Sequence, residues 1–188
     1  LLTHLSDGRP LRSANDLTTD EAIRLPKLEL LTSKPVLYVC NVREDDAASG
    51  NELCRLVAKK SVAEGAAHVI VSAAIESEIA LIENSEREEF LQELGLVEPG
   101  LNRLIRAGYA LLGLQSFFTA GPKECRAWTV PKGSRAPQAA GAIHTDFERG
   151  FIRAEVVSFE DYQNCGTENA ARESGKLRIE GKDYVVSD

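Results

Sequence analysis

The sequence contains no methionine and one tryptophan, and its aromatic residues make up only 6% of the chain. Its apolar runs are far shorter than the roughly 18 residues that a membrane-spanning helix needs, so we expect no membrane partner. The four cysteines, Cys40, Cys54, Cys125 and Cys165, are widely separated and include no C-x-x-C pair. This spacing argues against a zinc site and a disulfide framework, and it is typical of reduced thiols in a cytoplasmic protein.

The remaining composition is that of an ordinary globular protein. Hydrophobic residues account for 43% and charged residues for 27% of the 188 positions. A chain of this length can bury a core without metals or cross-links. Because the chain starts at Leu1 and has no methionine, we expect it to be part of a longer protein.

The formal net charge is −7, and it is unevenly distributed. Residues 1–114 hold 12 Lys and Arg against 18 Asp and Glu, whereas residues 115–188 hold 10 against 11. An acidic chain has little general affinity for nucleic acid, so we expect no DNA partner. A local basic segment in the second part remains compatible with RNA binding.

Residues 35–71 have the pattern of a strand, a helix and a second strand. Residues 35–40 and 68–71 are continuous apolar runs, which are typical of parallel strands covered on both faces. Between them, Ser49 and Glu52 have the spacing of a capping box and predict the start of a helix. The segment therefore predicts a parallel βαβ unit.

The flanking segments differ from this unit and from each other. Residues 1–33 predict short helices that cannot form a core alone, and further helices are expected up to residue 112. The remainder predicts two strands, a helix, a strand, a second helix and two short strands, at residues 116–120, 125–130, 137–143, 151–159, 167–174, 177–179 and 184–186. This order of elements is typical of a β-grasp fold.

Candidate binding residues follow each predicted parallel strand. Asn41-Val42-Arg43-Glu44 follows the first strand, and Ser72-Ala73-Ala74 follows the second. Parallel α/β sheets bind ligands at the carboxyl ends of their strands, so both segments are expected at one edge. An asparagine and an acid three residues apart can contact a flat heterocycle, and a turn of small residues can offer backbone amides to the same base. Either segment alone is also typical of an ordinary turn.

The first segment departs from Asn-Lys-x-Asp, the guanine-reading motif of GTPases. Val42 replaces the lysine, and Glu44 replaces the aspartate that accepts two hydrogen bonds from guanine. The longer acid would not lie where guanine needs it. We therefore expect relaxed guanine preference and tolerance of adenine.

A basic segment lies in the second part of the chain. Lys123, Arg126, Lys132 and Arg135 place four positive charges within 13 residues. Strand alternation puts Arg126 and Trp128 on the same face, where they could contact RNA phosphate and a stacked base. The alternative is a solvated sheet edge with the arginine over the tryptophan ring.

Longer segments point to a known family. The most extensive are Phe117-Phe118-Thr119-Ala120-Gly121-Pro122-Lys123-Glu124, Ala136-Pro137-Gln138-Ala139-Ala140-Gly141 and Gly150-Phe151-Ile152-Arg153-Ala154-Glu155-Val156. Together with Asn41-Val42-x-Glu44 and Ser72-Ala73-Ala74-Ile75-Glu76, they resemble the YchF, or Obg-like, ATPases. The resemblance covers almost the whole chain, which looks like the C-terminal half of a member.

The resemblance implies an architecture. It implies an α/β P-loop NTPase-type G domain, present in part with its parallel sheet and a helical insertion, followed by an α+β β-grasp domain of the TGS type. The implied parts are the return arm of the insertion, the C-terminal part of the G domain, linker helices and the TGS domain, at residues 1–33, 34–88, 89–114 and 115–188.

The resemblance also implies ligands and partners. ATP is expected in preference to GTP, with slow hydrolysis supported by Mg²⁺ and with association with the ribosome. The nucleotide-binding residues of the family map onto Asn41, Val42, Glu44, Ser72, Ala73 and Ala74. The TGS resemblance favours RNA or ribosome contact for Lys123, Arg126, Trp128, Lys132 and Arg135.

Part of the family's machinery is absent from the sequence. No G-x-x-x-x-G-K-[ST] motif occurs, and no D-x-x-G follows a predicted strand. The phosphate cradle, the Mg²⁺ ligands and the water-positioning segment would therefore come from residues outside this chain. The chain alone is expected to be inactive, with no catalytic or metal-binding residues of its own.

The leading hypothesis is a fragment of a ribosome-associated, ATP-hydrolysing P-loop NTPase with relaxed guanine specificity. One alternative is a non-catalytic RNA- or ribosome-binding regulatory module in which the half G domain serves only as scaffold. Another is a regulator that works through protein contacts alone. A P-loop upstream of residue 1 would distinguish the enzyme from the binding module.

Overall fold

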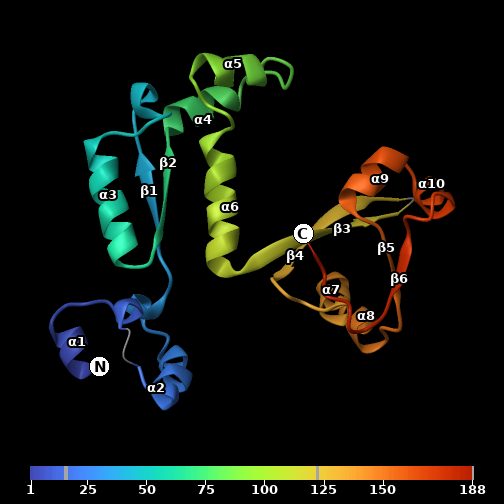
Figure 1. Ribbon diagram of the computed structural model, residues 1–188, viewed down its shortest axis with the longest axis horizontal. Helices are drawn as coiled ribbons and strands as arrows, with labels where there is room; N and C mark the ends of the chain where they lie inside the picture. Colours follow the sequence, from blue (N-terminus) through green and yellow to red (C-terminus); the bar gives the residue numbers. More distant parts are fainter. Residues whose placement is uncertain (15–16, 122, 188) are drawn as a thin grey trace. The chain divides into compact units, whose positions relative to one another are not determined.

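The computed structural model describes residues 1–14, 17–121 and 123–187. The chain forms two compact units, Leu1–Leu112 and Gly113–Asp188 (Figure 1). Pro122, which belongs to the family-like segment 117–124, lies outside the described residues. No helix within these ranges is long and apolar enough to cross a membrane.

The first unit begins with short helical turns. They are α1 (Leu2–Ser6), η1 (Leu11–Ser13), α2 (Thr19–Arg24), η2 (Leu25–Leu28) and η3 (Leu31–Ser33). Thr18 and Glu21 form a capping box at the start of α2, where the Glu21 carboxylate accepts the Thr18 N–H at 2.9 Å. Arg12 in η1 donates to the Glu64 carboxylate at 3.2 Å, which fastens this segment to the rest of the unit.

The next elements confirm the predicted parallel βαβ order. β1 (Leu37–Asn41) and β2 (Ala67–Val71) pair in parallel, with Leu37 opposite Ala67 and Asn41 opposite Val71. The helix α3 (Glu52–Ala63) connects the two strands and packs against one side of the pair (Figure 1). Because the strands run in the same direction, their carboxyl ends lie at the same edge.

The cap of α3 differs from the prediction. Asn51, rather than Ser49, caps the helix, and its side-chain oxygen accepts the Cys54 N–H at 3.2 Å. Gly50 has a φ of +69° and turns the chain between the two candidate caps. The Ser49 hydroxyl therefore points elsewhere and donates to the Gly50 carbonyl.

The parallel sheet is less enclosed than its continuous apolar runs predict. It contains two strands in the described part of the chain, and Val39 in β1 is 49% exposed. Leu53, Leu56 and Val62 on α3 are exposed as well. Strands covered on both faces need further layers of structure, and two strands with their flanking helices do not supply them.

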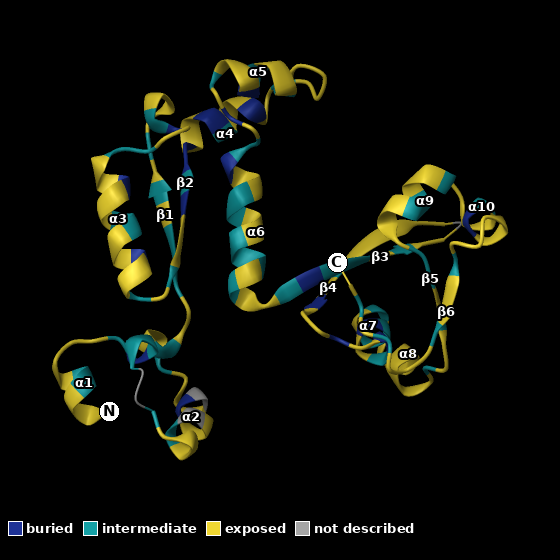
Figure 2. Cartoon of the chain, in the orientation of Figure 1, coloured by how far each residue is buried: buried dark blue, intermediate teal, exposed yellow. Residues whose placement is uncertain are grey.

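The core of the first unit lies around α4 (Ala73–Ile79) and α5 (Arg87–Glu93) (Figure 2). Ile75 is 1% exposed and packs in a cluster with Ala47, Ile79, Leu91 and Leu96. After this cluster, α6 (Gly100–Leu112) packs against β2, on the side away from α3 in Figure 1. The core thus supports the segment that directly follows β2.

The second unit contains two antiparallel strand pairs and four helices in its described residues. β3 (Leu114–Ala120) pairs with β4 (Cys125–Pro131), and β5 (Ala154–Val156) pairs with β6 (Arg178–Glu180). The helices are α7 (Ala136–Ile143), α8 (Thr145–Arg149), α9 (Phe159–Cys165) and α10 (Glu168–Glu173). Ala136 and Ala139 of α7 are buried, as is Val130 of β4, and α7 packs against β4.

The predicted strand over residues 151–159 is too long. Only Ala154–Val156 forms the strand β5, and Phe159 begins the helix α9. Ser158 caps that helix, because its hydroxyl accepts the Asp161 N–H at 3.1 Å. A Ser-x-x-Asp spacing is a helix-start signal, and here it outweighs the partial alternation of the preceding residues.

Candidate nucleotide-binding site

The two predicted base-binding segments lie together at the carboxyl edge of the parallel sheet. Asn41 is the last residue of β1, and Ser72 directly follows β2. The Asn41 side-chain oxygen Oδ1 accepts the Ala73 N–H at 3.0 Å, although the two residues are 32 positions apart. This hydrogen bond links the two segments directly, while the Asn41 side chain remains at an exposed surface.

The backbone of Val42 continues the pairing of β1 with β2. Its N–H donates to the Val71 carbonyl at 2.9 Å, one residue beyond the last residue of β1. This bond sets the direction of the chain as it leaves the strand. The first segment therefore has a defined backbone conformation up to the position that departs from the guanine-reading motif.

The residues Ser72, Ala73 and Ala74 form the start of a helix rather than the predicted turn. Ser72 is the cap residue of α4, and Ala73 and Ala74 belong to its first turn. Both alanines are exposed, whereas Ser72 is only 3% exposed. The Ser72 hydroxyl does not cap the helix, and this buried oxygen has no hydrogen-bond partner among the described residues. The Ala73 N–H already donates to Asn41, so a polar ligand edge would have to use the later first-turn N–H groups of α4.

Glu44 begins a short helical turn, η4 (Glu44–Asp46), and its side chain is exposed. Asp46 in the same turn accepts the side-chain amide of Asn51 at 2.9 Å, and its carbonyl accepts the Gly50 N–H at 2.7 Å. Asn51 also caps α3. The loop that carries Glu44 is therefore held by hydrogen bonds to the start of the connecting helix.

A thiol lies directly before Asn41 on β1. Burial raises the pKa of the Cys40 thiol, and the neighbouring Cys54 raises it further. Both effects favour the neutral thiol. Cys40 and Cys54 are both unoxidised, and Cys54 is buried. These cysteines therefore behave as packing residues of the strand and helix.

Two contacts beside the candidate site were not predicted from the sequence. The Glu76 carboxylate oxygen Oε1 accepts the Gly100 N–H at 2.7 Å, and Arg103 donates to the Ile70 carbonyl at 3.0 Å. These contacts join α6 to both sides of the Ser72–Ala74 segment. Glu76 is the last residue of the Ser72-Ala73-Ala74-Ile75-Glu76 segment. No local sequence pattern indicates that its hydrogen-bond partner is Gly100, 24 residues later.

Arg126 and Trp128 in the second unit lie on the same face, as strand alternation predicts, with the arginine over the tryptophan ring as in the alternative of a solvated sheet edge. The guanidinium carbon of Arg126 lies 4.4 Å from the centre of the Trp128 ring. The indole N–H donates to the Thr119 hydroxyl at 2.9 Å, and Phe117 lies opposite Trp128 in the strand register. This face of the β3–β4 hairpin carries an aromatic ring, a positive charge and a hydroxyl side by side.

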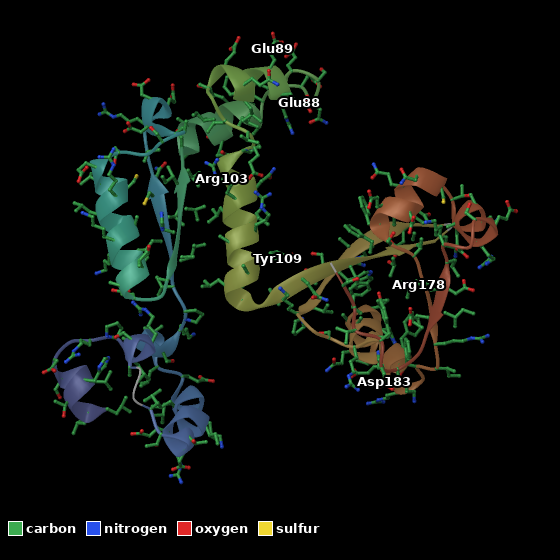
Figure 3. All side chains as sticks on the ribbon, in the orientation of Figure 1. Glu88, Glu89, Arg103, Tyr109, Arg178 and Asp183 are labelled. Atoms are coloured by element: carbon green, nitrogen blue, oxygen red, sulfur yellow. The ribbon has the colours of Figure 1, made fainter. Side chains whose placement is uncertain are left out.

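The other basic residues do not form a single cluster with this pair. Lys123 precedes β4, and Lys132 follows it, so about 20 Å of strand separates them at roughly 3.3 Å per residue. Arg135 forms an ion pair with Asp183 at 2.8 Å; both side chains are exposed, and Asp183 is labelled in Figure 3. These charges are close in the sequence but not in space, because the extended strand β4 separates Lys123 from Lys132.

Metal-ligating side chains are not grouped in either unit. In residues 1–14, 17–121 and 123–187, no three His, Cys, Asp or Glu side chains are placed to hold a metal ion. The residues of the candidate base site are amide, apolar and small side chains with one exposed acid. They do not fit a Mg²⁺ site, which needs several oxygen ligands.

Comparison with known proteins relates this chain to one family. Residues 114–188 match the YchF-GTPase_C family, described as "Protein of unknown function (DUF933)". Over its whole length, the chain is 53% identical to the "Ribosome-binding ATPase YchF" of Escherichia coli O157:H7, covering 51% of that protein. The chain is thus similar to the YchF proteins over about half of their length.

Further relatives and a solved structure support the YchF relationship. The chain is 52% identical to the "Ribosome-binding ATPase YchF" of Bacillus subtilis strain 168, over 96% of the chain and 50% of that protein. It is 42% identical to "Obg-like ATPase 1" of Rattus norvegicus, over 98% of the chain and 47% of that protein. The "Structure of the Schizosaccharomyces pombe YchF GTPase" matches 99% of the chain and 50% of that structure, with a TM-score of 0.80 at 34% identity. The chain thus spans about half the length of its YchF relatives.

Proposed function

We propose that this chain is part of a ribosome-associated P-loop NTPase of the Obg-like class, which binds and hydrolyses ATP with relaxed discrimination against GTP. The observation that carries the proposal is the hydrogen bond from the Ala73 N–H to Asn41, which assembles two segments into one base-binding edge. The names of the YchF relatives, which include both ATPase and GTPase, agree with this activity.

In the proposed complex, the nucleotide base lies at the edge formed by Asn41, Val42 and the start of α4. Asn41 orients the second segment, and the backbone near Val42 contacts the adenine edge. Glu44 replaces the aspartate of the guanine-reading motif, and its additional methylene displaces the carboxylate from the position that guanine requires. The site therefore accepts adenine because it lacks the feature that selects guanine.

Hydrolysis requires groups that this chain does not contain. A P-loop, the Mg²⁺ ligands and a water-positioning residue would belong to another part of the complete protein. Within that arrangement, residues 34–88 form the C-terminal part of the G domain, residues 1–33 the return arm of its helical insertion and residues 89–114 linker helices. Residues 115–188 form the TGS domain. The chain alone supplies base recognition and partner binding.

The second unit supplies the proposed contact with the ribosome. Arg126 stacked on Trp128 presents a guanidinium group for phosphate and an aromatic surface for a base. Lys123 and Lys132 lie beyond the two ends of β4 and add to the attraction for RNA, whereas the charge of Arg135 is partly offset by its ion pair with Asp183. A non-catalytic RNA- or ribosome-binding module, with the first unit as scaffold, is the second candidate, and the same Arg126–Trp128 pair favours it.

Titration of ATP and GTP into the complete protein tests the base-reading proposal. We expect similar dissociation constants for the two nucleotides, and we expect Glu44→Asp to shift the preference towards GTP. Glu78→Asp, an equally exposed acid on α4, serves as the matched control. A strong GTP preference in the unchanged protein would refute the role given to Glu44, and absence of nucleotide binding would favour the binding-module alternative.

Co-sedimentation with ribosomes tests the role of the second unit. We expect Arg126→Ala to reduce the bound fraction several-fold at low salt, with the difference from the unchanged protein narrowing as added salt screens the phosphate contact. Arg149→Ala removes an exposed charge elsewhere in the same unit and should have little effect. Equal binding by the unchanged protein and Arg126→Ala would instead support a regulator that acts through protein contacts.

A further inference from the structure

We propose that Glu76 is a positioning residue for the base-binding segment and that it acts through the first turn of α6. This inference rests on the proposed function, because it assigns a role within the same nucleotide site. Glu76 has no contact with the base in this proposal. It holds the Ser72–Ala74 segment in the place where Asn41 can bind it.

The Glu76 side chain joins two helices at their starts. It lies in the first turn of α4, where its backbone N–H donates to the Ser72 carbonyl at 3.0 Å. Its carboxylate oxygen Oε1 accepts the Gly100 N–H at 2.7 Å. A carboxylate is a strong acceptor for a backbone N–H at a helix start, because both the hydrogen bond and the helix dipole favour it.

Gly100 permits this contact because the backbones approach closely. A β-carbon at this position would lie 3.1 Å from Glu76 Oε1 and 3.3 Å from the Cα atom of Val71. These distances are shorter than those of ordinary carbon contacts, so a larger residue would push Glu76 or the end of β2 away. Gly100 is itself buried. The start of α6 therefore rests directly on the last residue of β2.

Arg103 provides a second attachment one turn further along α6. Its guanidinium Nη2 donates to the Ile70 carbonyl at 3.0 Å; Arg103 is labelled in Figure 3. The two contacts lie on either side of Val71, whose carbonyl accepts the Val42 N–H. α6 therefore binds the end of β2 through Arg103 and Ile70, and it binds the first turn of α4 through Gly100 and Glu76.

Burial holds Ser72, Ile75 and Ile79, but it does not hold the two alanines between Ser72 and Ile75. Ile75 and Ile79 are fixed in the core, whereas Ala73 and Ala74 are exposed. The buried Ser72 hydroxyl gives no additional hydrogen bond. Asn41, through the Ala73 N–H, and Glu76, through the Gly100 N–H, add hydrogen bonds that join this end of α4 to β1 and to α6.

The inference is tested by measuring dissociation constants of ATP and of inorganic tripolyphosphate for the complete protein. Tripolyphosphate has no base, so it reports on phosphate binding alone. We expect Glu76→Ala to weaken ATP binding about tenfold, the size expected for one hydrogen bond to a charged group, and to leave tripolyphosphate binding unchanged. Glu76→Gln retains an acceptor for the Gly100 N–H and should recover most of the ATP affinity. Glu78→Ala is the matched control on the same helix.

Further measurements separate the possible failures. If Asn41→Ala weakens ATP binding and Glu76→Ala does not, the positioning role is wrong and the base site stands. If neither variant changes ATP binding, the proposed base site is wrong. Equal losses for ATP and tripolyphosphate with Glu76→Ala would show general damage and would also overturn the inference. If Glu76→Ala does not fold, Gly100→Ala provides the same test, and a loss confined to ATP is again the expected result.

Discussion

Replacement of Asn41 tests the central contact of the proposed site. The Asn41 side-chain oxygen accepts the Ala73 N–H at 3.0 Å. We expect its side-chain NH₂ group to donate to the nucleotide base as well. Asn41→Ala removes both interactions. Asn41→Asp keeps an acceptor for the Ala73 N–H but loses the side-chain amide that donates to the base. The two variants therefore separate the assembly of the site from direct contact with the ligand.

The expected magnitudes follow from the number of hydrogen bonds that each variant loses. One hydrogen bond contributes about 1 kcal/mol net, which corresponds to a roughly fivefold change in the dissociation constant. Asn41→Ala loses about two such contributions, so we expect ATP binding about 30-fold weaker. Asn41→Asp loses about one, so we expect binding about fivefold weaker. Tripolyphosphate affinity should stay constant in both variants.

The assay is calorimetric titration of ATP into the complete protein and its variants. Asn102→Ala, an exposed asparagine on α6, provides the control for removal of a surface amide. Equal affinities for Asn41→Ala and Asn41→Asp would show that the Ala73 contact contributes nothing to binding. Unchanged affinity in both variants would refute the placement of the base at this edge.

Two further predictions concern stability. Ile75 is 1% exposed, so Ile75→Ala should lower the free energy of unfolding by about 3 kcal/mol in chemical denaturation, whereas Val97→Ala, at a 98% exposed position, should change it by less than about 0.5 kcal/mol. The Tyr38 hydroxyl and then Arg12 lower the pKa of Glu64 from its ordinary value of 4.5. Its contribution to stability is therefore present above pH 4.5 and lost as the pH falls through the lowered pKa. The difference in stability between the unchanged protein and Glu64→Gln should disappear over that range, and a difference that persists at lower pH would contradict this assignment.

Local signals in the sequence were sufficient for much of the secondary structure. The apolar runs at residues 35–40 and 68–71 largely coincide with the two parallel strands, Leu37–Asn41 and Ala67–Val71. Thr18 caps α2 together with Glu21, as the Thr-x-x-Glu spacing predicts. These features depend on neighbouring residues and on the period of the side chains, which the sequence displays directly. One error arose where two local signals competed: at Ser158, a helix cap replaces the end of a predicted strand.

The sequence by itself determined which residues stand at the candidate base site, because strand ends and short motifs are local properties. Only the tertiary structure decided how they meet. The Asn41–Ala73 and Glu76–Gly100 hydrogen bonds join residues 32 and 24 positions apart, and no local pattern encodes such pairs. The structure also separated Lys123 from Lys132, because the strand between them is extended. The separation of two residues in space can be derived from their separation in sequence only when the backbone conformation between them is known.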